Sequence, residues 1–204
     1  MQQYTVNSYM KLLCTLEGVK VFQQSDNIIS FIANADIDAD GGVHAYNSRN
    51  TGLDDNKNAK NGSIWVGVAT NSRGVPYKDS NGYYISTTAY QWPQYPINDH
   101  KRYVDSETVP YVVVSPLIRS NATGIILGCK AIITNTLTKQ SIEAVVADIG
   151  PKNKLGEISI AAAKAIGINS NPRTGGQDIK VISYVLYPGI PAVVNGVTYN
   201  LIHC

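Results

Sequence analysis

The residues of this chain best suited to chemistry are two carboxylates nine positions apart. Asp148 ends the hydrophobic run 145–147, and a Gly-Pro turn at 150–151 follows it. Glu157 lies in a Gly-Glu-Ile-Ser segment that opens a small-residue helix. A loop of this length could fold back and place both carboxylates across one cleft. Hydrolysis of a glycosidic bond with inversion needs such a pair, roughly 6.5–9.5 Å apart, one as acid and one as base.

Both carboxylates also have simpler interpretations. Asp148 could form a turn at the end of a strand, as aspartate often does. Glu157 could be an ordinary acidic residue near a helix N-terminus, where the helix dipole favours negative charge. Spacing alone leaves these alternatives open.

A second acidic group is formed by Asp36, Asp38 and Asp40, in the pattern D-x-D-x-D-G. This pattern matches the first half of a calcium loop, but the twelfth position is Asn47 instead of the bidentate glutamate. On a strand, alternate residues share one face, and like charges there repel unless a cation lies between them. We expect the three aspartates to bind ammonium groups of a cationic sugar, and we expect no metal site.

The third group is the aromatic loop 83–93, which contains Tyr84, Tyr90 and Trp92. Exposed aromatic rings offer sugars a flat apolar surface. We predict that Tyr84 or Trp92 stacks on a sugar ring, with burial in the core as the alternative for Tyr84 and Tyr90. Trp65 is expected in the core.

The elements that must position these residues are mostly strands. Runs rich in Val, Ile, Tyr and Thr are separated by Gly, Pro, Asn and Asp, which is typical of a β protein. The predicted strands are 19–23, 28–33, 64–69, 83–88, 111–114, 125–134, 141–147, 179–187 and 196–202. A helix is predicted over 158–166, ended by Gly167, and a second short helix over 5–16. Long polar stretches at 34–62, 70–81 and 91–109 are expected to line a binding site.

Bulk properties exclude several function classes. The chain has 204 residues and a net charge of +2, too small to indicate binding to nucleic acid or a membrane surface. No apolar run approaches the roughly 18 residues of a membrane span. The motifs G-x-S-x-G, P-loop and G-x-G-x-x-G are missing from the sequence.

We expect one domain over 18–204 after a lead-in at 1–17. We expect this domain to be a monomer that needs no cofactor. Cys14, Cys129 and Cys204 are expected to be free or partly paired thiols.

Several ordered motifs resemble glycoside hydrolase family 75, the chitosanases of fungi and bacteria. The resemblance covers roughly residues 18–190. The motifs are DIDADG at 36–41, TGLDD at 51–55, YYISTT at 83–88, RYVDSETVPY at 102–111, VVADIGP at 145–151, GEIS at 156–159 and Gly175-Gly176.

The resemblance implies that Asp148 and Glu157 are the essential carboxylates of an inverting endo-hydrolase acting on β-1,4-linked glucosamine. It also implies a secreted protein. The N-terminus lacks the basic-then-apolar layout of a signal peptide, so a cytoplasmic location stays open.

A second resemblance concerns the fold. The segment 148–167 is similar to the end of a double-psi β-barrel, as in rare lipoprotein A, lytic transglycosylase A and family 45 endoglucanases. In the catalytic members of that group, the position matching Glu157 holds the general acid. The fold expected is therefore mainly β, with a six-stranded double-psi-like core, long loops and one or two short helices.

The function predicted is endo-hydrolysis of chitosan with inversion, with Glu157 as acid and Asp148 as base. The alternatives are a peptidoglycan-directed hydrolase or lytic transglycosylase, and a non-catalytic expansin-like glycan-binding module. A polycationic substrate requires the acidic residues to gather on one face despite the net charge. The residues expected there are Asp36, Asp38, Asp40, Asp54, Asp55, Asp148 and Glu157.

Overall fold

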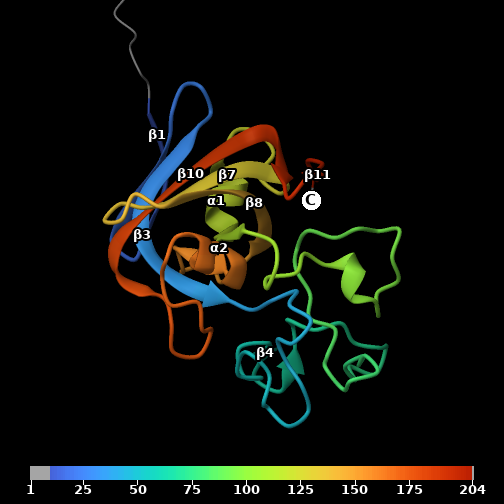
Figure 1. The fold of residues 1–204 in the computed structure, drawn as a ribbon. Helices are drawn as coiled ribbons and strands as arrows, with labels where there is room; N and C mark the ends of the chain where they lie inside the picture. Colours follow the sequence, from blue (N-terminus) through green and yellow to red (C-terminus); the bar gives the residue numbers. More distant parts are fainter. Residues whose placement is uncertain (1–9, 204) are drawn as a thin grey trace, which may run out of the picture.

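The computed structural model describes residues 10–203 as a mainly β protein with a closed six-stranded mixed β-barrel and two short helices (Figure 1). The strands are β1 (Lys11–Leu16), β2 (Val19–Gln23), β3 (Ile29–Asp38), β4 (Lys60–Asn61), β5 (Ile64–Trp65), β6 (Tyr111–Val114), β7 (Cys129–Asn135), β8 (Ser141–Ile149), β9 (Glu157–Ser159), β10 (Gln177–Val194) and β11 (Val197–Tyr199). The helices are α1 (Pro116–Asn121) and α2 (Ile160–Ala165), with a 3₁₀ turn η1 (His100–Arg102).

The barrel closes because β10 pairs with β7 on one side and with β3 on the other. Around the barrel the order is β3-β9-β6-β8-β7-β10. The pairs β3–β9 and β6–β8 are parallel, and the other four are antiparallel. The β1–β2 hairpin extends the sheet from β3, and β11 extends it from β10.

The alternation of side chains along the strands separates a core face from an outer face. On β3, Phe31, Ala33 and Ile37 are buried in the main core, where Phe31 stacks on Tyr184 with ring centroids 4.8 Å apart. The intervening residues of β3, among them Asp36 and Asp38, therefore point away from the barrel interior. This alternation decides where the acidic side chains of β3 can lie.

The predicted helix over 158–166 is present but shorter, because β9 takes up residues 157–159. Ser159 caps α2: its Oγ accepts a hydrogen bond from Ala162 N–H at 3.1 Å. Gly167, with φ of 70°, follows the helix as predicted. The sequence did not predict α1, which begins with Pro116 and is capped by Ser115.

The helix predicted over 5–16 is wrong where the structure describes it, and residues 5–9 lie outside the described range. Residues 11–16 form β1, which pairs with β2. Glu17 and Gly18 both have positive φ, 49° and 75°, as a two-residue hairpin turn requires. The boundary expected at residue 17 falls within this hairpin.

Residues 39–109, which we call the loop lobe, contain little regular structure and lie beside the barrel (Figure 1). Of the strands predicted over 64–69 and 83–88, only β5 forms, and an isolated bridge joins Val68 to Ser86. The other predicted strands coincide or overlap with β2, β3, β6, β7, β8, β10 and β11.

Cys14 and Cys129 are free thiols, and Cys204 lies outside the described range. Within residues 10–203, no helix is long and apolar enough to cross a membrane.

Ser159 joins three elements, so its loss should destabilise the fold. Its buried hydroxyl accepts from Ala162 N–H and Tyr111 N–H, and it donates to the Val109 carbonyl at 2.8 Å. We expect Ser159→Ala to lower the free energy of unfolding by about 2–3 kcal/mol, measured by urea denaturation. Ser120→Ala, at an exposed position, is the control; an equal loss in both variants would contradict the assignment.

Candidate active site

Strand register brings Asp148 and Glu157 to the two sides of one residue, Val113. Val113 of β6 pairs with Glu157 of β9 on one side and with Asp148 of β8 on the other. Asp36 of β3 pairs with Glu157 from the next strand, so the row reads Asp36, Glu157, Val113, Asp148. Since strands lie about 4.8 Å apart, the Cα atoms of Asp148 and Glu157 are about 10 Å apart. This separation is compatible with the carboxyl spacing of inverting glycosidases.

An irregularity in β8 makes this row possible. Val112 pairs with Val146, but Val113 pairs with Asp148, so Ala147 is an extra residue opposite β6. Val146 belongs to the main core, whereas Ala147 packs with Val113 on the outer face. Strict alternation would turn Asp148 back toward the interior. The bulge instead directs Asp148 to the same face as Glu157, a role that bulges often have beside active sites.

Two glycines allow Glu157 to approach its neighbours closely. A Cβ atom on Gly150 would lie 3.0 Å from Glu157 Oε2 and 2.9 Å from a methyl of Val113. Gly156 has a φ of 80°, and a Cβ there would lie 2.4 Å from the Asn34 carbonyl oxygen. Larger residues at either position would displace Glu157.

The carboxylates line a cleft of about 890 Å³ between the barrel and the loop lobe. Six of the seven acidic residues expected on one face line it: Asp36, Asp38, Asp40, Asp54, Asp148 and Glu157. Asp55 does not. Lys57, Lys60 and Lys154 line it as well, so the cleft is not uniformly acidic.

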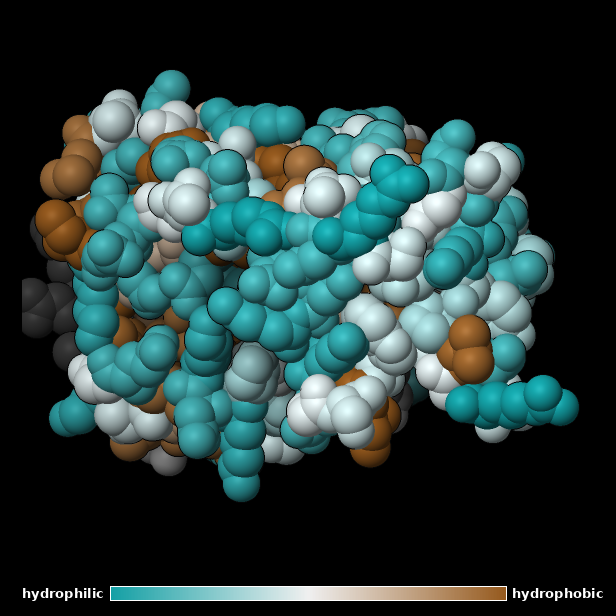
Figure 2. Space-filling view, turned by 90° about the horizontal axis from the view of Figure 1, so that it is seen from below, coloured by the Kyte–Doolittle hydropathy of each residue, from teal (hydrophilic) through white to brown (hydrophobic). Residues whose placement is uncertain are grey.

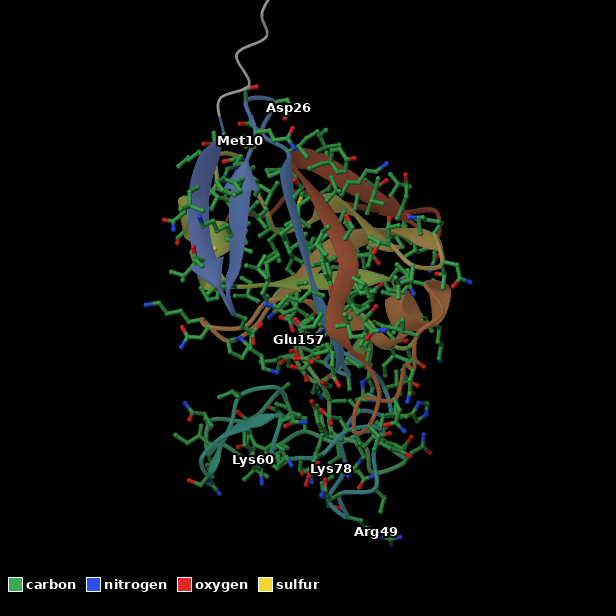
Figure 3. The ribbon with its side chains drawn as sticks, turned by 90° about the vertical axis from the view of Figure 1, so that its left-hand side faces the viewer. Met10, Asp26, Arg49, Lys60, Lys78 and Glu157 are labelled. Atoms are coloured by element: carbon green, nitrogen blue, oxygen red, sulfur yellow. The ribbon has the colours of Figure 1, made fainter. Side chains whose placement is uncertain are left out.

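The two walls of the cleft are visible in Figure 3, where Glu157 lies on the side of the barrel that faces the lobe bearing Lys60. Arg173, in the α2–β10 loop, donates hydrogen bonds to the carbonyls of Asn50 and Asp54 at 2.9 and 2.8 Å. These bonds tie the lobe to the barrel. The face seen from the lobe side is mostly hydrophilic (Figure 2), which suits a polar ligand.

Asp148 and Glu157 differ in their hydrogen bonding. Asp148 is 9% exposed, and its Oδ1 accepts from the N–H groups of Ala89 and Ile149, both at 2.8 Å. The Glu157 carboxylate is partly buried and accepts no hydrogen bond from any residue of the described range 10–203. Because such bonds favour the ionised form, Asp148 is better equipped to carry a charge and Glu157 to hold a proton.

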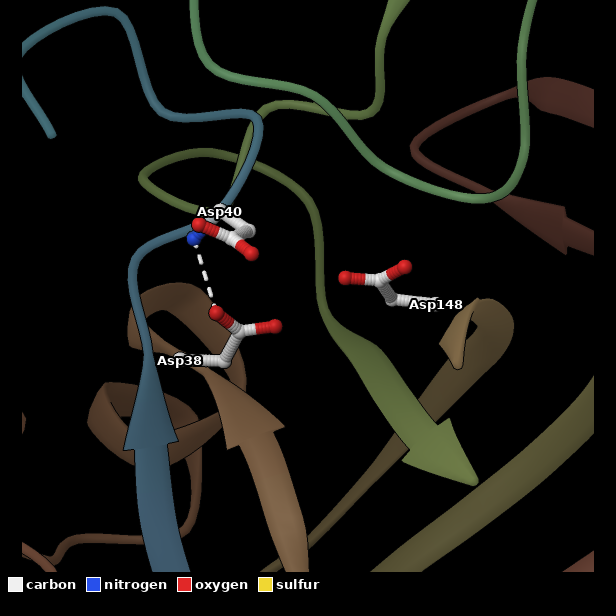
Figure 4. A group of neighbouring side chains, drawn as sticks. All are labelled: Asp38, Asp40 and Asp148. Carbon is white, nitrogen blue, oxygen red and sulfur yellow. Dashed lines mark hydrogen bonds between the residues drawn. The ribbon is translucent and has the colours of Figure 1, made fainter. Parts of the chain in front are cut away.

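Asp38 and Asp40 are each anchored by a tyrosine hydroxyl. Tyr111 donates to Asp38 Oδ2 at 2.9 Å, and Tyr46 donates to Asp40 Oδ1 at 2.8 Å. Asp38 Oδ1 also accepts from Asp40 N–H at 2.8 Å (Figure 4). One carboxylate oxygen each from Asp38, Asp40 and Asp148 lies within 4.8 Å of the others. The three side chains therefore form one compact acidic cluster.

Burial and mutual repulsion raise the proton affinity of the whole group. Burial, then the charge of Asp38, raises the pKa of Asp148 to about 8 and that of Glu157 to about 8. Burial raises the pKa of Asp38 only to about 6, because the bonds from Asp40 N–H and Tyr111 oppose it. Burial and the charge of Asp38 raise the pKa of Asp40 well above its ordinary value. Groups with such pKa values suit acid–base chemistry near neutral pH.

Asp36 is set apart from this group by Lys154. The Lys154 ammonium lies 3.0 Å from Asp36 Oδ2, and both side chains are partly exposed. Asp36 therefore already has a cationic partner at the rim of the cleft.

The structure does not place the predicted aromatic platforms in the cleft. Tyr84 is 7% exposed and packs edge-on against Trp65, 5.0 Å between ring centroids, within the main core. Trp92 packs on Tyr90 and Tyr199 and lines a separate cavity of about 400 Å³. Tyr84 thus takes the alternative of burial in the core, and Trp92 lies outside the carboxylate cleft.

Sequence reasoning missed Val113, Tyr111, Tyr46 and Lys154. Val113 and Tyr111 lie in β6, a strand that was predicted, but no local pattern indicates that β6 inserts between β8 and β9. The abundance of tyrosine over phenylalanine, 13 against 2, was the available signal that tyrosine hydroxyls are used in buried positions.

Comparison with known proteins adds no relative. No model of a known protein family matches the chain, and no curated protein is similar to it in sequence.

The raised pKa of Asp148 predicts a pH-dependent effect on stability. Its ionised form is disfavoured in the folded state, so stability falls as pH rises from about 4 to about 8. Asp148→Asn removes this charge and keeps an acceptor for Ala89 N–H. We expect it to raise the free energy of unfolding by several kcal/mol at pH 8 and to leave it nearly unchanged at pH 4, measured by urea denaturation at both pH values.

The control for this measurement is Asp26→Asn, at an exposed aspartate. A gain for Asp148→Asn that is the same at pH 4 and pH 8 would show that charge is not its cause.

Proposed function

We propose that this protein is an endo-acting glycoside hydrolase that cleaves β-1,4-linked glucosamine polymer, chitosan, with inversion of configuration. The observation that carries this proposal is the pairing of both Asp148 and Glu157 with Val113 in a single cleft. The two residues lie on one face, with Cα atoms about 10 Å apart by strand spacing, which suits an inverting pair with a water molecule between its carboxyl groups. The resemblance to glycoside hydrolase family 75 supports the same residues.

In the proposed mechanism, Glu157 protonates the glycosidic oxygen and Asp148 deprotonates the attacking water. Among the residues that the structure describes, none donates a hydrogen bond to the Glu157 carboxylate, whereas Asp148 accepts from two backbone N–H groups. Both pKa values are raised to about 8, so the productive state is the one in which the pair holds a single proton, on Glu157.

Asp40 is the residue best placed to bind a substrate ammonium group. Its Oδ1 accepts from Tyr46, and its Oδ2 accepts no hydrogen bond within the described part of the chain. Asp36 would have to exchange Lys154 for the substrate. An ammonium group close to Asp40 would make charge-assisted hydrogen bonds and relieve the repulsion between the aspartates.

We also propose that the barrel is of the double-psi type. It has six strands, and the antiparallel pair β9–β6 separates the two parallel pairs β3–β9 and β6–β8. The segment 148–167 that suggested this fold supplies β9 and α2 in the structure. A secreted location is part of the proposal, because the substrate is a polymer found outside cells.

A second candidate is a hydrolase or lytic transglycosylase acting on peptidoglycan. The observation in its favour is the pair Lys57 and Lys60 in the lobe wall of the cleft, which could bind carboxylates that chitosan lacks. Anhydro-sugar ends in the products would identify lytic chemistry. Binding to glycans without cleavage would identify an expansin-like module instead.

The carboxylate assignment is tested by Glu157→Gln and Asp148→Asn. We expect each to lower kcat on chitosan by at least about 10²-fold, because an acid or a base is lost, while wild-type protein releases products of inverted anomeric configuration, followed by NMR. Glu143→Gln is the matched control: Glu143 is exposed on the same strand as Asp148 and pairs with Lys130. Near-wild-type turnover in a folded Glu157 or Asp148 variant would refute the assignment.

The ammonium site is tested by Asp40→Asn with chitosans of different acetylation. Because N-acetylation removes the positive charge, we expect KM to rise about 10-fold on fully deacetylated chitosan and less on highly acetylated chitosan. An equal rise on both substrates would mean that Asp40 does not bind an ammonium group.

A further inference from the structure

Asp38 has a different environment from the other carboxylates of the cleft. Its side chain is 8% exposed, and each of its oxygens already accepts a hydrogen bond, from Asp40 N–H or from the Tyr111 hydroxyl. Donors on both oxygens stabilise the ionised form. A side chain so buried and so fully bonded is poorly placed to contact a sugar.

The tyrosine that holds Asp38 is itself fixed. Tyr111 is fully buried, and its N–H donates to Ser159 Oγ at 3.0 Å. Its hydroxyl lies 2.9 Å from both Asp38 Oδ2 and the Asp40 carbonyl oxygen. The position of the Asp38 carboxylate is thus set by β6 and by the chain turn after β3.

Asp38 lies close to both members of the proposed catalytic pair. Along β3 and β9, Asp36 pairs with Glu157 and Asp38 pairs with Ser159, so Asp38 is on the same face of β3, two residues beyond the partner of Glu157. A carboxylate oxygen of Asp38 lies within 4.8 Å of one of Asp148 (Figure 4). A negative charge at this position repels charge on both Asp148 and Glu157.

We propose that Asp38 is a positioning residue of the hydrolase: its buried charge acts through Asp148 and Glu157 and keeps one proton on that pair, and Tyr111 keeps Asp38 charged. This inference rests on the proposed function. It replaces, for Asp38, the expectation that the side chain binds substrate ammonium groups.

Other groups also face Glu157, and their effects must be separated from that of Asp38. They are Asp36 on β3, Asp40 after it, Asp148 on β8, Lys154 in the β8–β9 loop and Tyr184 on β10. Among the charges, that of Asp38 has the largest effect on the pKa of Glu157, and Lys154 opposes it. Asp38 likewise has the largest charge effect on Asp148.

The chain allows a direct measurement on Glu157 that does not need activity. It has four glutamates, Glu17, Glu107, Glu143 and Glu157, so ¹³C labelling of glutamate side-chain carboxyls gives few NMR signals, and Glu157→Gln assigns the one of interest. We expect Asp38→Asn to lower the apparent pKa of Glu157 by about one unit, because a like charge is removed.

Two tyrosine variants accompany this titration. Tyr111→Phe should lower the apparent pKa of Glu157 in the same direction by less, because Asp38 remains but is less often charged. Tyr103→Phe is the matched control: Tyr103 is also buried, and its hydroxyl donates to the Ile97 carbonyl and not to a carboxylate. An unchanged Glu157 titration in both Asp38→Asn and Tyr111→Phe overturns the proposal.

The activity measurement separates positioning from substrate binding. For Asp38→Asn we expect the alkaline limb of the kcat/KM profile on chitosan to move about one unit to lower pH. A raised KM with unmoved limbs would make Asp38 a substrate ligand and overturn the proposal. If wild-type protein cleaves no glycan, the proposed function fails, and the NMR titration alone then decides whether Asp38 controls the proton.

Discussion

Buried carboxylates of like charge repel one another, and this protein holds Asp38, Asp40, Asp148 and Glu157 together against that repulsion. Isolated, such groups would move apart or take up protons. Here the backbone cannot yield, because Asp38, Asp148 and Glu157 belong to strands of a closed barrel. Burial, and after it this repulsion, raises the pKa values of the group.

The barrel resists the repulsion through connections that lie behind the site. Each strand of the acidic row is hydrogen-bonded on both sides, and the core beneath it is packed by residues such as Phe31, Ile158 and Tyr184. Tyr46, Tyr111 and the backbone N–H groups of Ala89 and Ile149 then supply donors to the individual carboxylates. The packing and hydrogen bonds of the barrel thus offset the unfavourable repulsion at the site. For this reason the proposed acid–base pair can be kept in a fixed geometry.

Much of the local structure could be predicted from the sequence. β2 and β6 have the predicted bounds, and Gly167 follows α2 as predicted. These features depend on side-chain periodicity and on hydrogen bonds within a few residues, which a sequence displays directly. The gathering of acidic residues was also predictable, since six of the seven residues expected on one face line one cleft.

The sequence by itself singled out the carboxylates that line the cleft: Asp148, Glu157 and the aspartates near residue 38. Only the tertiary structure decided how they meet. Val113 enters between β8 and β9 from a distant part of the chain, and one extra residue at Ala147 turns Asp148 outward. Tyr84 packs in the main core, and the Tyr111 hydroxyl donates a hydrogen bond to Asp38. These outcomes depend on long-range strand pairing and on which apolar surfaces are buried together, and neither leaves a pattern in local spacing.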